Sequence, residues 1–114
     1  MGDRDLKINI IVLLGKTKSK KAVPYLLELI DSDLNRNVIM SLDEIGDKRA
    51  IPYLMNCIKN DYTRNNIYFT GETIKIVSNL SKRPFDNNAY YSTDLEHKKI
   101  IIKEWLDWWT PPKK

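Results

Sequence analysis

Ala50-Ile51-Pro52-Tyr53-Leu54 repeats the earlier segment Ala22-Val23-Pro24-Tyr25-Leu26, 28 positions further along the chain (22 to 50). An apolar residue and a glycine precede each segment, as Leu14-Gly15 and as Ile45-Gly46. A period of about 20–50 residues is the sequence signature of repeat architectures, in which similar units stack on one another. The two segments therefore predict equivalent helices in successive repeats, with their tyrosines packed between neighbouring repeats.

The composition is that of a soluble globular chain. Of its 114 residues, 42% are hydrophobic and 30% are charged, and the formal net charge is +4. This balance predicts a single folded domain over residues 1–114 rather than a disordered segment. The longest apolar run, residues 8–14, is far too short to cross a bilayer. The single cysteine, Cys57, cannot form an intramolecular disulfide, which favours a buried thiol in a reducing, cytoplasmic setting.

Hydrophobic spacing predicts four helices in the first half of the chain, over residues 3–14, 20–30, 34–45 and 48–58. In the first of these helices the apolar residues recur at helical spacing. The residues that fall at this spacing are Leu6, Ile10, Leu13 and Leu14. This spacing is what predicts the first helix.

Capping residues predict where these helices begin and end. Glycine adopts the left-handed conformation that ends many helices, so Gly15 and Gly46 are predicted C-caps. Ser19, Asp33 and Asp47 are predicted N-caps, because their side chains can accept backbone N–H groups that have no partner within the helix.

Residues 62–80 allow two alternatives. Either one long helix tolerates Gly71 at a cost of about 1 kcal/mol, or a polar break through Asn66 precedes a shorter helix that begins near Thr70. The polar residues favour the break. Residues 82–92 are rich in turn residues and predict a loop whose aromatic side chains pack against the protein.

The last helix has its own start signal. Thr93 and Glu96 have the spacing of a capping box, with Thr93 as the N-cap. The helix is predicted to reach Trp109, and Pro111-Pro112 end it.

Residues 37–54 resemble the HEAT-like repeat of the phycobilisome-lyase type, because they contain an Ile-Gly-Asp turn followed by Ala-Ile-Pro-x-Leu. Residues 80–85 and the Trp105-x-x-Trp108-Trp109 pattern are similar to the closing segment that follows the last repeat in that family. The resemblance implies an all-α fold, a short right-handed α-solenoid of about six helices and 2.5 repeats. Residues 81–114 would form a closing loop and a capping helix. One departure is Asn35, at a position where the family commonly has arginine.

The residues that usually carry chemistry are scattered. His97 is the only histidine, and its neighbours suggest a solvated or capping role rather than a catalytic one. One histidine and one cysteine, 40 positions apart (57 to 97), form no metal-ligand cluster. The four glycines are isolated, so there is no phosphate-binding loop. The sequence therefore predicts no enzyme, no metal and no cofactor.

Repeat proteins of this kind usually bind other macromolecules. We therefore predict a protein-binding adaptor, scaffold or inhibitor that uses the second helix of each repeat, since mixed charge, amides and an adaptable methionine suit protein recognition. The predicted contacts are Asn35, Arg36, Asn37, Met40, Asp43 and Glu44 on one helix, and Tyr68, Glu72, Thr73 and Lys75 on the next.

Three other interactions remain open. The first is nucleic-acid binding through a phosphate or acidic-partner patch made by Lys16, Lys18, Lys20, Lys21 and Arg49. A second, which rests on the resemblance alone, is a role as accessory subunit of a bilin lyase-like enzyme. The third is a homodimer, because the first helix matches only the second half of a repeat and leaves an apolar N-terminal face.

Overall fold

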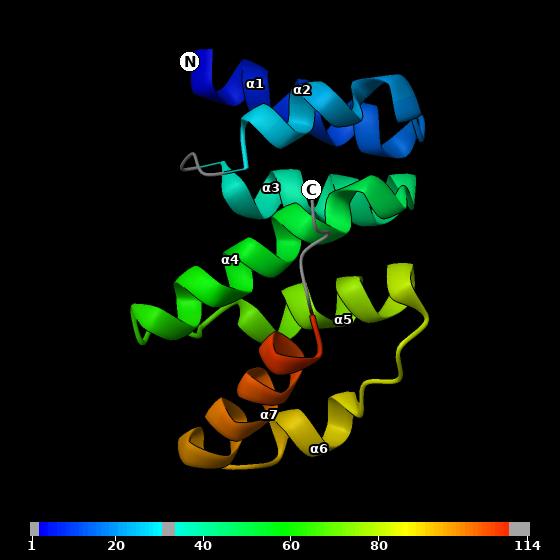
Figure 1. Cartoon of the computed structure of the whole chain (residues 1–114). Coiled ribbons are helices and arrows are strands. Elements are labelled where there is room, and N and C mark those ends of the chain that lie inside the picture. The colour runs from blue at the N-terminus through cyan, green and yellow to red at the C-terminus, as the bar shows by residue number, and fades with distance from the viewer. Residues whose placement is uncertain (1–2, 31–33, 110–114) are drawn as a thin grey trace, which may run out of the picture. The chain divides into compact units, whose positions relative to one another are not determined.

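A computed structural model of the chain describes residues 3–30 and 34–109, and in these residues every regular element is a helix (Figure 1). The elements are α1 (Asp3–Lys16), η1 (Lys20–Ala22), α2 (Val23–Glu28), α3 (Asn35–Ile45), η2 (Lys48–Ala50), α4 (Ile51–Thr63), α5 (Thr70–Ser81), α6 (Asn87–Tyr91) and α7 (Leu95–Trp108). The predicted all-α class is confirmed, with seven α-helices in the described residues instead of about six. Two short 3-10 helices precede α2 and α4.

The chain forms two compact units, Met1–Tyr53 and Leu54–Lys114. The first unit contains α1, α2, α3 and the first turn of α4. The second contains the rest of α4 together with α5, α6 and α7. The prediction of a single domain over residues 1–114 stays a prediction.

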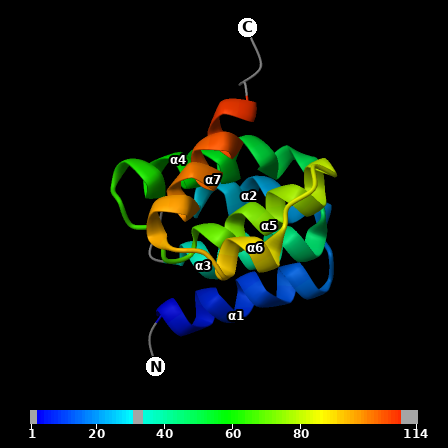
Figure 2. The same ribbon diagram turned by 90° about the horizontal axis from the view of Figure 1, so that it is seen from below.

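In the first unit α1 packs along α3, and α2 contacts α3 and η2 (Figures 1 and 2). The fully buried side chains of this unit include Ile11, Val23, Leu26, Val38 and Leu42, each with 0% of its surface exposed. These residues come from all three helices. Burial of their apolar surface is the main force that holds the helices together.

The contact between α1 and α3 depends on two small residues. Gly15 is buried and lies against Ser41, so closely that a Cβ atom at residue 15 would be 2.9 Å from the Cα, Cβ and Oγ atoms of Ser41. The Ser41 hydroxyl donates a hydrogen bond of 2.7 Å to the carbonyl oxygen of Ile11. Small side chains therefore allow the two backbones to approach, and the buried hydroxyl has a partner.

This packing corrects the expectations for the first helix. Gly15 is not a C-cap, because α1 continues through it to Lys16 and the glycine serves a close helix contact instead. The apolar residues at helical spacing are mostly not the buried side of α1, because only Leu14 of the four is half-buried and the other three are exposed. Leu6 and Leu13 are each 60% exposed and Ile10 is 40% exposed, since α3 packs against the other side of α1, where Ile11 and Gly15 lie.

The capping predictions for the next helices had mixed outcomes. Gly46 ends α3 in the left-handed conformation with φ 72°, and Asp47 accepts a hydrogen bond of 2.9 Å from the backbone N–H of Arg49, so both predictions are confirmed. Ser19 makes no side-chain capping bond before η1, which was not expected. Asp33 lies outside the described residues.

In the second unit the turns before α5 confirm the break after residue 63, because α4 ends at Thr63 and α5 begins at Thr70. Gly71 lies in the first turn of α5 against aromatic rings. A Cβ atom there would be 2.6 Å from Tyr90 Cε2 and 2.6 Å from the Tyr91 hydroxyl. Glycine at this position thus allows α6 to pack against α5.

Two expectations for the C-terminal third were wrong. Residues 82–92 are not all loop: α6 forms within them, because Asp86 accepts a hydrogen bond of 2.9 Å from the N–H of Ala89. The N-cap of α7 is Asp94 instead of Thr93. Its carboxylate accepts bonds from the backbone N–H of His97 at 2.9 Å and joins the His97 Nδ1 atom at 2.7 Å, so the ionised side chain is the one that satisfies the helix end.

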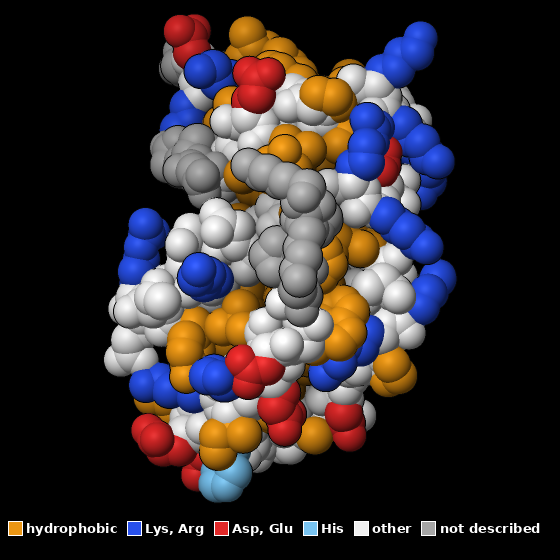
Figure 3. Space-filling view, in the orientation of Figure 1, with side chains coloured by type: hydrophobic (Ala, Val, Ile, Leu, Met, Phe, Trp, Pro, Cys, Tyr) orange, Lys and Arg blue, Asp and Glu red, His pale blue; other side chains and the backbone are white. Residues whose placement is uncertain are grey.

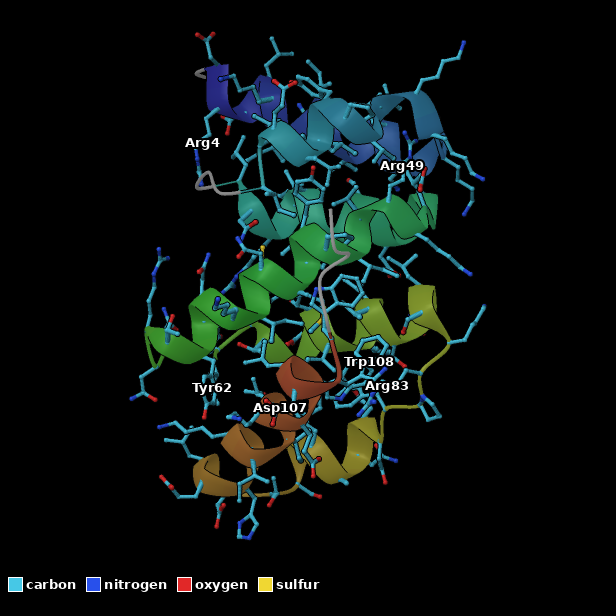
Figure 4. The ribbon with its side chains drawn as sticks, in the orientation of Figure 1. Arg4, Arg49, Tyr62, Arg83, Asp107 and Trp108 are labelled. Carbon is cyan, nitrogen blue, oxygen red and sulfur yellow. The ribbon has the colours of Figure 1, made fainter. Side chains whose placement is uncertain are left out.

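An aromatic cluster holds α7 in the second unit. The Arg83 guanidinium lies over the rings of Trp105 and Trp108, 4.6 and 4.9 Å from their centroids (Figure 4). The Phe85 ring contacts Tyr90 and Trp105 at centroid distances of 5.6 and 6.0 Å. The loop after α5 therefore packs against the protein, as its aromatic residues predicted. Pro111 and Pro112 lie outside the described residues.

Candidate functional site

The solvent face of α3 forms the candidate surface of the first unit. Arg36, Met40 and Glu44 recur at intervals of four residues and are all exposed, and Met40 is 58% exposed. Since residues four apart lie on one side of a helix, these three form a continuous row. Asn37 and Asp43 are half-buried at its two margins. We call these five residues the α3 surface.

The row is exposed because the opposite side of α3 is buried in the unit. Val38, Leu42 and Ile45 are buried at spacings of four and three residues, and Ser41 faces α1. Asn35, the remaining predicted contact, is half-buried in the first turn. The α3 surface is thus carried by a helix that is fixed from behind.

In the second unit a comparable row follows α5. Tyr68 is 80% exposed just before the helix, and Glu72 and Lys75 are exposed four and seven residues later. Asn79 is also exposed and continues the row, although sequence reasoning missed it. Its spacing of four residues from Lys75 was the available signal. We call these four residues the α5 surface.

Thr73 is a correction to the predicted contacts. It is 1% exposed, and its hydroxyl donates a hydrogen bond of 3.3 Å to the carbonyl oxygen of Phe69. A residue one position after Glu72 is rotated by about 100° around the helix, which turns it from the solvent to the core. Thr73 is therefore a packing residue.

Glu72 is held in place by Tyr91 of α6. The Tyr91 hydroxyl donates a hydrogen bond to the Glu72 carboxylate, and burial together with this bond and the negative charge raises the pKa of Tyr91 well above its ordinary value. A related pair lies at the start of α5, where the Thr70 hydroxyl bonds to Asp61 at 2.8 Å. Burial raises the pKa of Asp61, and the Thr70 bond opposes that shift. The acidic groups near the α5 surface are thus positioned by neighbours.

The predicted basic patch is exposed at the turn between α1 and α2, and Lys and Arg side chains gather at that edge in Figure 3. The Arg49 guanidinium donates a hydrogen bond of 3.0 Å to the carbonyl oxygen of Lys20, which brings these two residues together (Figure 4). The same guanidinium forms an ion pair of 2.7 Å with Asp47. Hydrogen bonds from Arg49 lower the pKa of Asp47 below its ordinary value, so the carboxylate offsets one charge of the patch.

A second basic residue makes a structural bond. The Lys18 ammonium donates to the backbone carbonyl oxygen of Glu44 at 3.2 Å, at the C-terminal end of α3. This position suits a cation, because the last carbonyl groups of a helix carry partial negative charge. Lys16, Lys20 and Lys21 remain exposed beside it.

The first unit also has an open hollow of about 470 Å³ that sequence reasoning did not identify. Its lining residues come from α2, η2 and the start of α4: Val23, Pro24, Leu27, Glu28, Arg49 and Tyr53. Tyr53 lines it while 47% exposed, and Tyr25 is 41% exposed, so the two repeated tyrosines are less enclosed than predicted. The available signal was the repeat itself, which places a tyrosine of one repeat beside the proline of the preceding one.

The groups that usually perform chemistry do not converge in the described parts of the chain. His97 is exposed and bonded to the N-cap of α7, as a capping histidine. Cys57 is buried, as predicted. Among the described residues no three His, Cys, Asp or Glu side chains are grouped so that they could hold a metal ion. Within the same residues no helix combines the length and the apolar character needed to cross a membrane.

Comparison with known protein families identifies a match over the first half of the chain. Residues 2–67 match the family model for HEAT repeats, and this stretch is more than half of the chain. Neither the curated proteins nor the solved structures that were compared contain a significant match. The matched residues include α1, α2, α3 and α4.

Proposed function

The chain belongs to the HEAT repeat family, and from this premise we propose that it is a non-enzymatic interaction module whose α3 and α5 surfaces bind a protein partner. HEAT repeats are commonly protein-interaction modules. The role covered by the proposal is that of an adaptor, a scaffold or an inhibitor acting in the cytoplasm. The narrower similarity to the phycobilisome-lyase type stays part of the proposal.

The α3 surface is the observation that carries this proposal. Its centre, Met40, is an exposed apolar side chain between a cation and an anion, Arg36 and Glu44. A methionine adapts its shape to a partner because its side chain is unbranched and flexible. Arginine and methionine are enriched in protein interfaces, and a small apolar centre with charged neighbours has the composition of an interface core and rim.

The rigidity of the supporting helix strengthens the argument. The backbone of α3 is held by Gly15 and Ser41 on the side of α1 and ends at a left-handed Gly46. A surface on a fixed helix loses little conformational entropy when a partner binds, so more of the contact energy appears as affinity.

The test uses two matched double variants. Arg36→Ala/Met40→Ala removes a cation and an apolar side chain from the α3 surface. Lys59→Ala/Ile100→Ala removes the same kinds of group from exposed positions of α4 and α7. Each chain, checked for folding by circular dichroism, is used as bait in cell extract, and bound proteins are measured by quantitative mass spectrometry.

We expect at least one protein that the natural chain and the Lys59/Ile100 variant retain and the Arg36/Met40 variant loses. With that protein purified, Arg36→Ala and Met40→Ala, each made singly, should weaken the Kd for it by about five- to thirtyfold, which corresponds to ~1–2 kcal/mol. Equal retention by both variants, with folding intact, would show that the α3 surface is not the binding face.

Nucleic-acid binding is the second candidate, and the exposed lysines at the turn between α1 and α2 favour it. Two of the five predicted cations already make structural contacts, because Arg49 pairs with Asp47 and Lys18 bonds to Glu44. A salt titration with duplex DNA and single-stranded RNA separates the candidates. Affinity that falls steeply as salt increases, with loss on Lys20→Ala/Lys21→Ala, would favour phosphate binding over the protein-binding proposal.

A further inference from the structure

The hollow of the first unit is mainly apolar. Of its apolar lining residues, Val23 is fully buried, Leu27 is half-buried, and Pro24 and Tyr53 are exposed. Concave sites that combine apolar walls with a few polar groups are the usual form of a ligand site, at volumes of about 300–1,000 Å³. With a volume of about 470 Å³ the hollow can accept a large apolar side chain.

The two charged lining residues stand at opposite ends of the hollow. Arg49 donates a hydrogen bond to the carbonyl oxygen of Lys20, just before α2 begins, whereas Glu28 is the last residue of α2 (Figure 4). From Val23 to Glu28 the helix rises by about 7.5 Å. The hollow therefore has a cationic end and an anionic end, with its apolar residues between them.

The neighbouring charges keep this polarity. The charged residues of the two segments that line the hollow, residues 19–30 and 47–53, are Lys20, Lys21, Glu28, Asp47, Lys48 and Arg49. All of them except Glu28 lie in η1 or η2 or directly before η2, so the end at Arg49 has four positive charges and one negative charge. The adjoining residues Lys16, Lys18, Asp43 and Glu44 add two charges of each sign and leave the balance unchanged. Within the two lining segments Glu28 alone charges the other end.

Both end groups have capacity for a ligand. The Arg49 guanidinium bonds to Asp47 and to the Lys20 carbonyl oxygen through its Nε and Nη2 atoms, which leaves Nη1 without a partner among the described residues. Because these bonds already hold the guanidinium, a carboxylate that binds Nη1 costs little side-chain entropy. Glu28 is exposed, and no cation of the described residues pairs with it.

From these observations we infer that the hollow binds an extended peptide segment of a partner protein, in which an apolar residue lies between an acidic residue and a basic one. An extended peptide points every second side chain to the same side, about 7 Å apart, so the three residues occupy alternate positions. The acidic side chain binds Arg49, the apolar one enters the hollow beside Tyr53, and the basic one binds Glu28. A nucleic acid matches this arrangement poorly, because its backbone offers Glu28 no cation.

This site is independent of the proposed function, because the hollow shares no residue with the α3 surface or the α5 surface. The contact is small, with one apolar side chain and two exposed ion pairs, and exposed ion pairs contribute only about 0.2–1 kcal/mol each. We therefore expect a weak, reversible site that adds to the affinity of a larger partner.

The test is a nuclear magnetic resonance titration of the isotope-labelled chain with two peptides, acetyl-Gly-Glu-Ser-Leu-Ser-Lys-Gly-amide and acetyl-Gly-Lys-Ser-Leu-Ser-Glu-Gly-amide. Both orders are used because a helical surface offers no backbone hydrogen bonds that would fix the direction of the peptide. At least one order should shift the amide signals of α2 and η2, with a Kd on the order of 0.1–1 mM. A peptide with serine in place of leucine should not bind.

The repeated tyrosines supply a matched pair of variants. Tyr53→Ala removes a lining residue and should weaken the Kd about tenfold or more. Tyr25→Ala removes the equivalent residue of the preceding repeat, which is 41% exposed and does not line the hollow, and it should leave the Kd unchanged. Circular dichroism verifies that each variant is folded, as expected for residues so exposed.

Glu28→Lys tests the charges. It should weaken binding of the bound peptide by about three- to tenfold and strengthen binding of the same peptide with glutamate in place of its lysine. Glu104→Lys makes the same change of charge at an exposed position of α7 and should alter neither affinity.

The inference is overturned if neither peptide gives saturable shifts up to about 10 mM. Equal losses in the two tyrosine variants, or a Glu28→Lys chain that keeps the natural preference between the peptides, would overturn it as well. Single-stranded RNA that displaces the peptide at equal concentration would assign the hollow to nucleic acid instead.

Discussion

Replacement of Gly15 by alanine tests the close contact between α1 and α3 on which the first unit depends. The added methyl carbon would lie 2.9 Å from three atoms of Ser41, one of which is the backbone Cα. Real Cβ atoms do not approach heavy atoms so closely. Because a backbone atom is among the neighbours, a simple rotation of the serine side chain cannot relieve the contact.

The expected magnitude combines opposing effects. Alanine has a helix propensity about 1 kcal/mol better than that of glycine, which would stabilise an exposed helix. Forcing a methyl group into occupied space costs about 1–3 kcal/mol. If Ser41 moves, its 2.7 Å bond to the Ile11 carbonyl oxygen is also lost, which costs about 1–3 kcal/mol for buried polar groups. If the Ser41 bond is lost, the net destabilisation is about 1 kcal/mol at the least and about 3 kcal/mol at the centre of these ranges; if it is kept, the net destabilisation is between about 0 and 2 kcal/mol.

The assay is urea unfolding followed by far-ultraviolet circular dichroism. Tryptophan fluorescence serves as an internal control, because residues 105, 108 and 109 all lie in the second unit and the substitution lies in the first. Ser41→Ala and the double variant complete a cycle. The double variant should lose less stability than the two single variants together, since the hydrogen bond can be lost only once. A Gly15→Ala chain that is more stable than the natural one, by the ~1 kcal/mol of helix propensity, would refute the close contact.

Three further predictions concern single sites. In the same urea assay Gly46→Ala should lower the free energy of unfolding by about 1–2 kcal/mol, because residue 46 has a left-handed φ of 72° while no atom crowds it. Gly46→Asn should lower it by less, since asparagine adopts this conformation more readily than alanine. Equal effects of the two substitutions would contradict this explanation. Hydrogen bonds from Arg49 lower the pKa of Asp47 below 3.8, so its contribution to stability is complete above that pH and is lost as pH falls through the folded-state pKa. The Asp47→Asn variant should therefore lose less of its free energy of unfolding than the natural chain loses when the pH is lowered from about 5 to about 2. Urea midpoints at each pH measure this difference. Arg83→Met keeps the apolar stem but removes the cation that lies over two indole rings. It should lower the free energy of unfolding by about 1–2 kcal/mol and shift the tryptophan emission. Unchanged emission would show that the contact is not formed in solution.

Local signals in the sequence were sufficient where the cause of a structure is local. The Gly46-Asp47 pair predicted both the end of α3 and the cap that follows, because left-handed glycine and an aspartate N-cap act within a few residues. The polar stretch before Thr70 likewise predicted the break between α4 and α5. The Asp94 cap of α7 was missed by one residue, since neighbouring Thr93 offers the same kind of oxygen at the same helix end.

Features that depend on residues far apart in the sequence could not be predicted from local patterns. Leu14-Gly15 and Ile45-Gly46 look alike in sequence, yet Gly46 ends a helix while Gly15 continues one, because only Gly15 has Ser41 against its Cα. The apolar residues of α1 surround much of the helix, so periodicity alone could not say which of them α3 would cover.

The candidate surface was predicted in part from the sequence. The row of Arg36, Met40 and Glu44 follows from helix geometry once the buried side of α3 is recognised, and all three are exposed. The prediction of Thr73 as a partner contact was wrong, because a threonine is polar enough to face solvent and small enough to be buried in a core. Its position in the sequence shows which of the two applies only when it is known which side of the helix is buried. The hollow beside Tyr53 required the pairing of two repeats, which no single segment contains.

The close contact at Gly15 supports the proposed α3 surface of the first unit. It fixes the side of α1 that faces α3, and so it determines that Leu6 and Leu13 point away from the unit. It also holds α3 from behind, so that Met40 is presented on a rigid helix. Gly15→Ala should therefore weaken partner binding at the α3 surface, and only in proportion to the loss of folded protein.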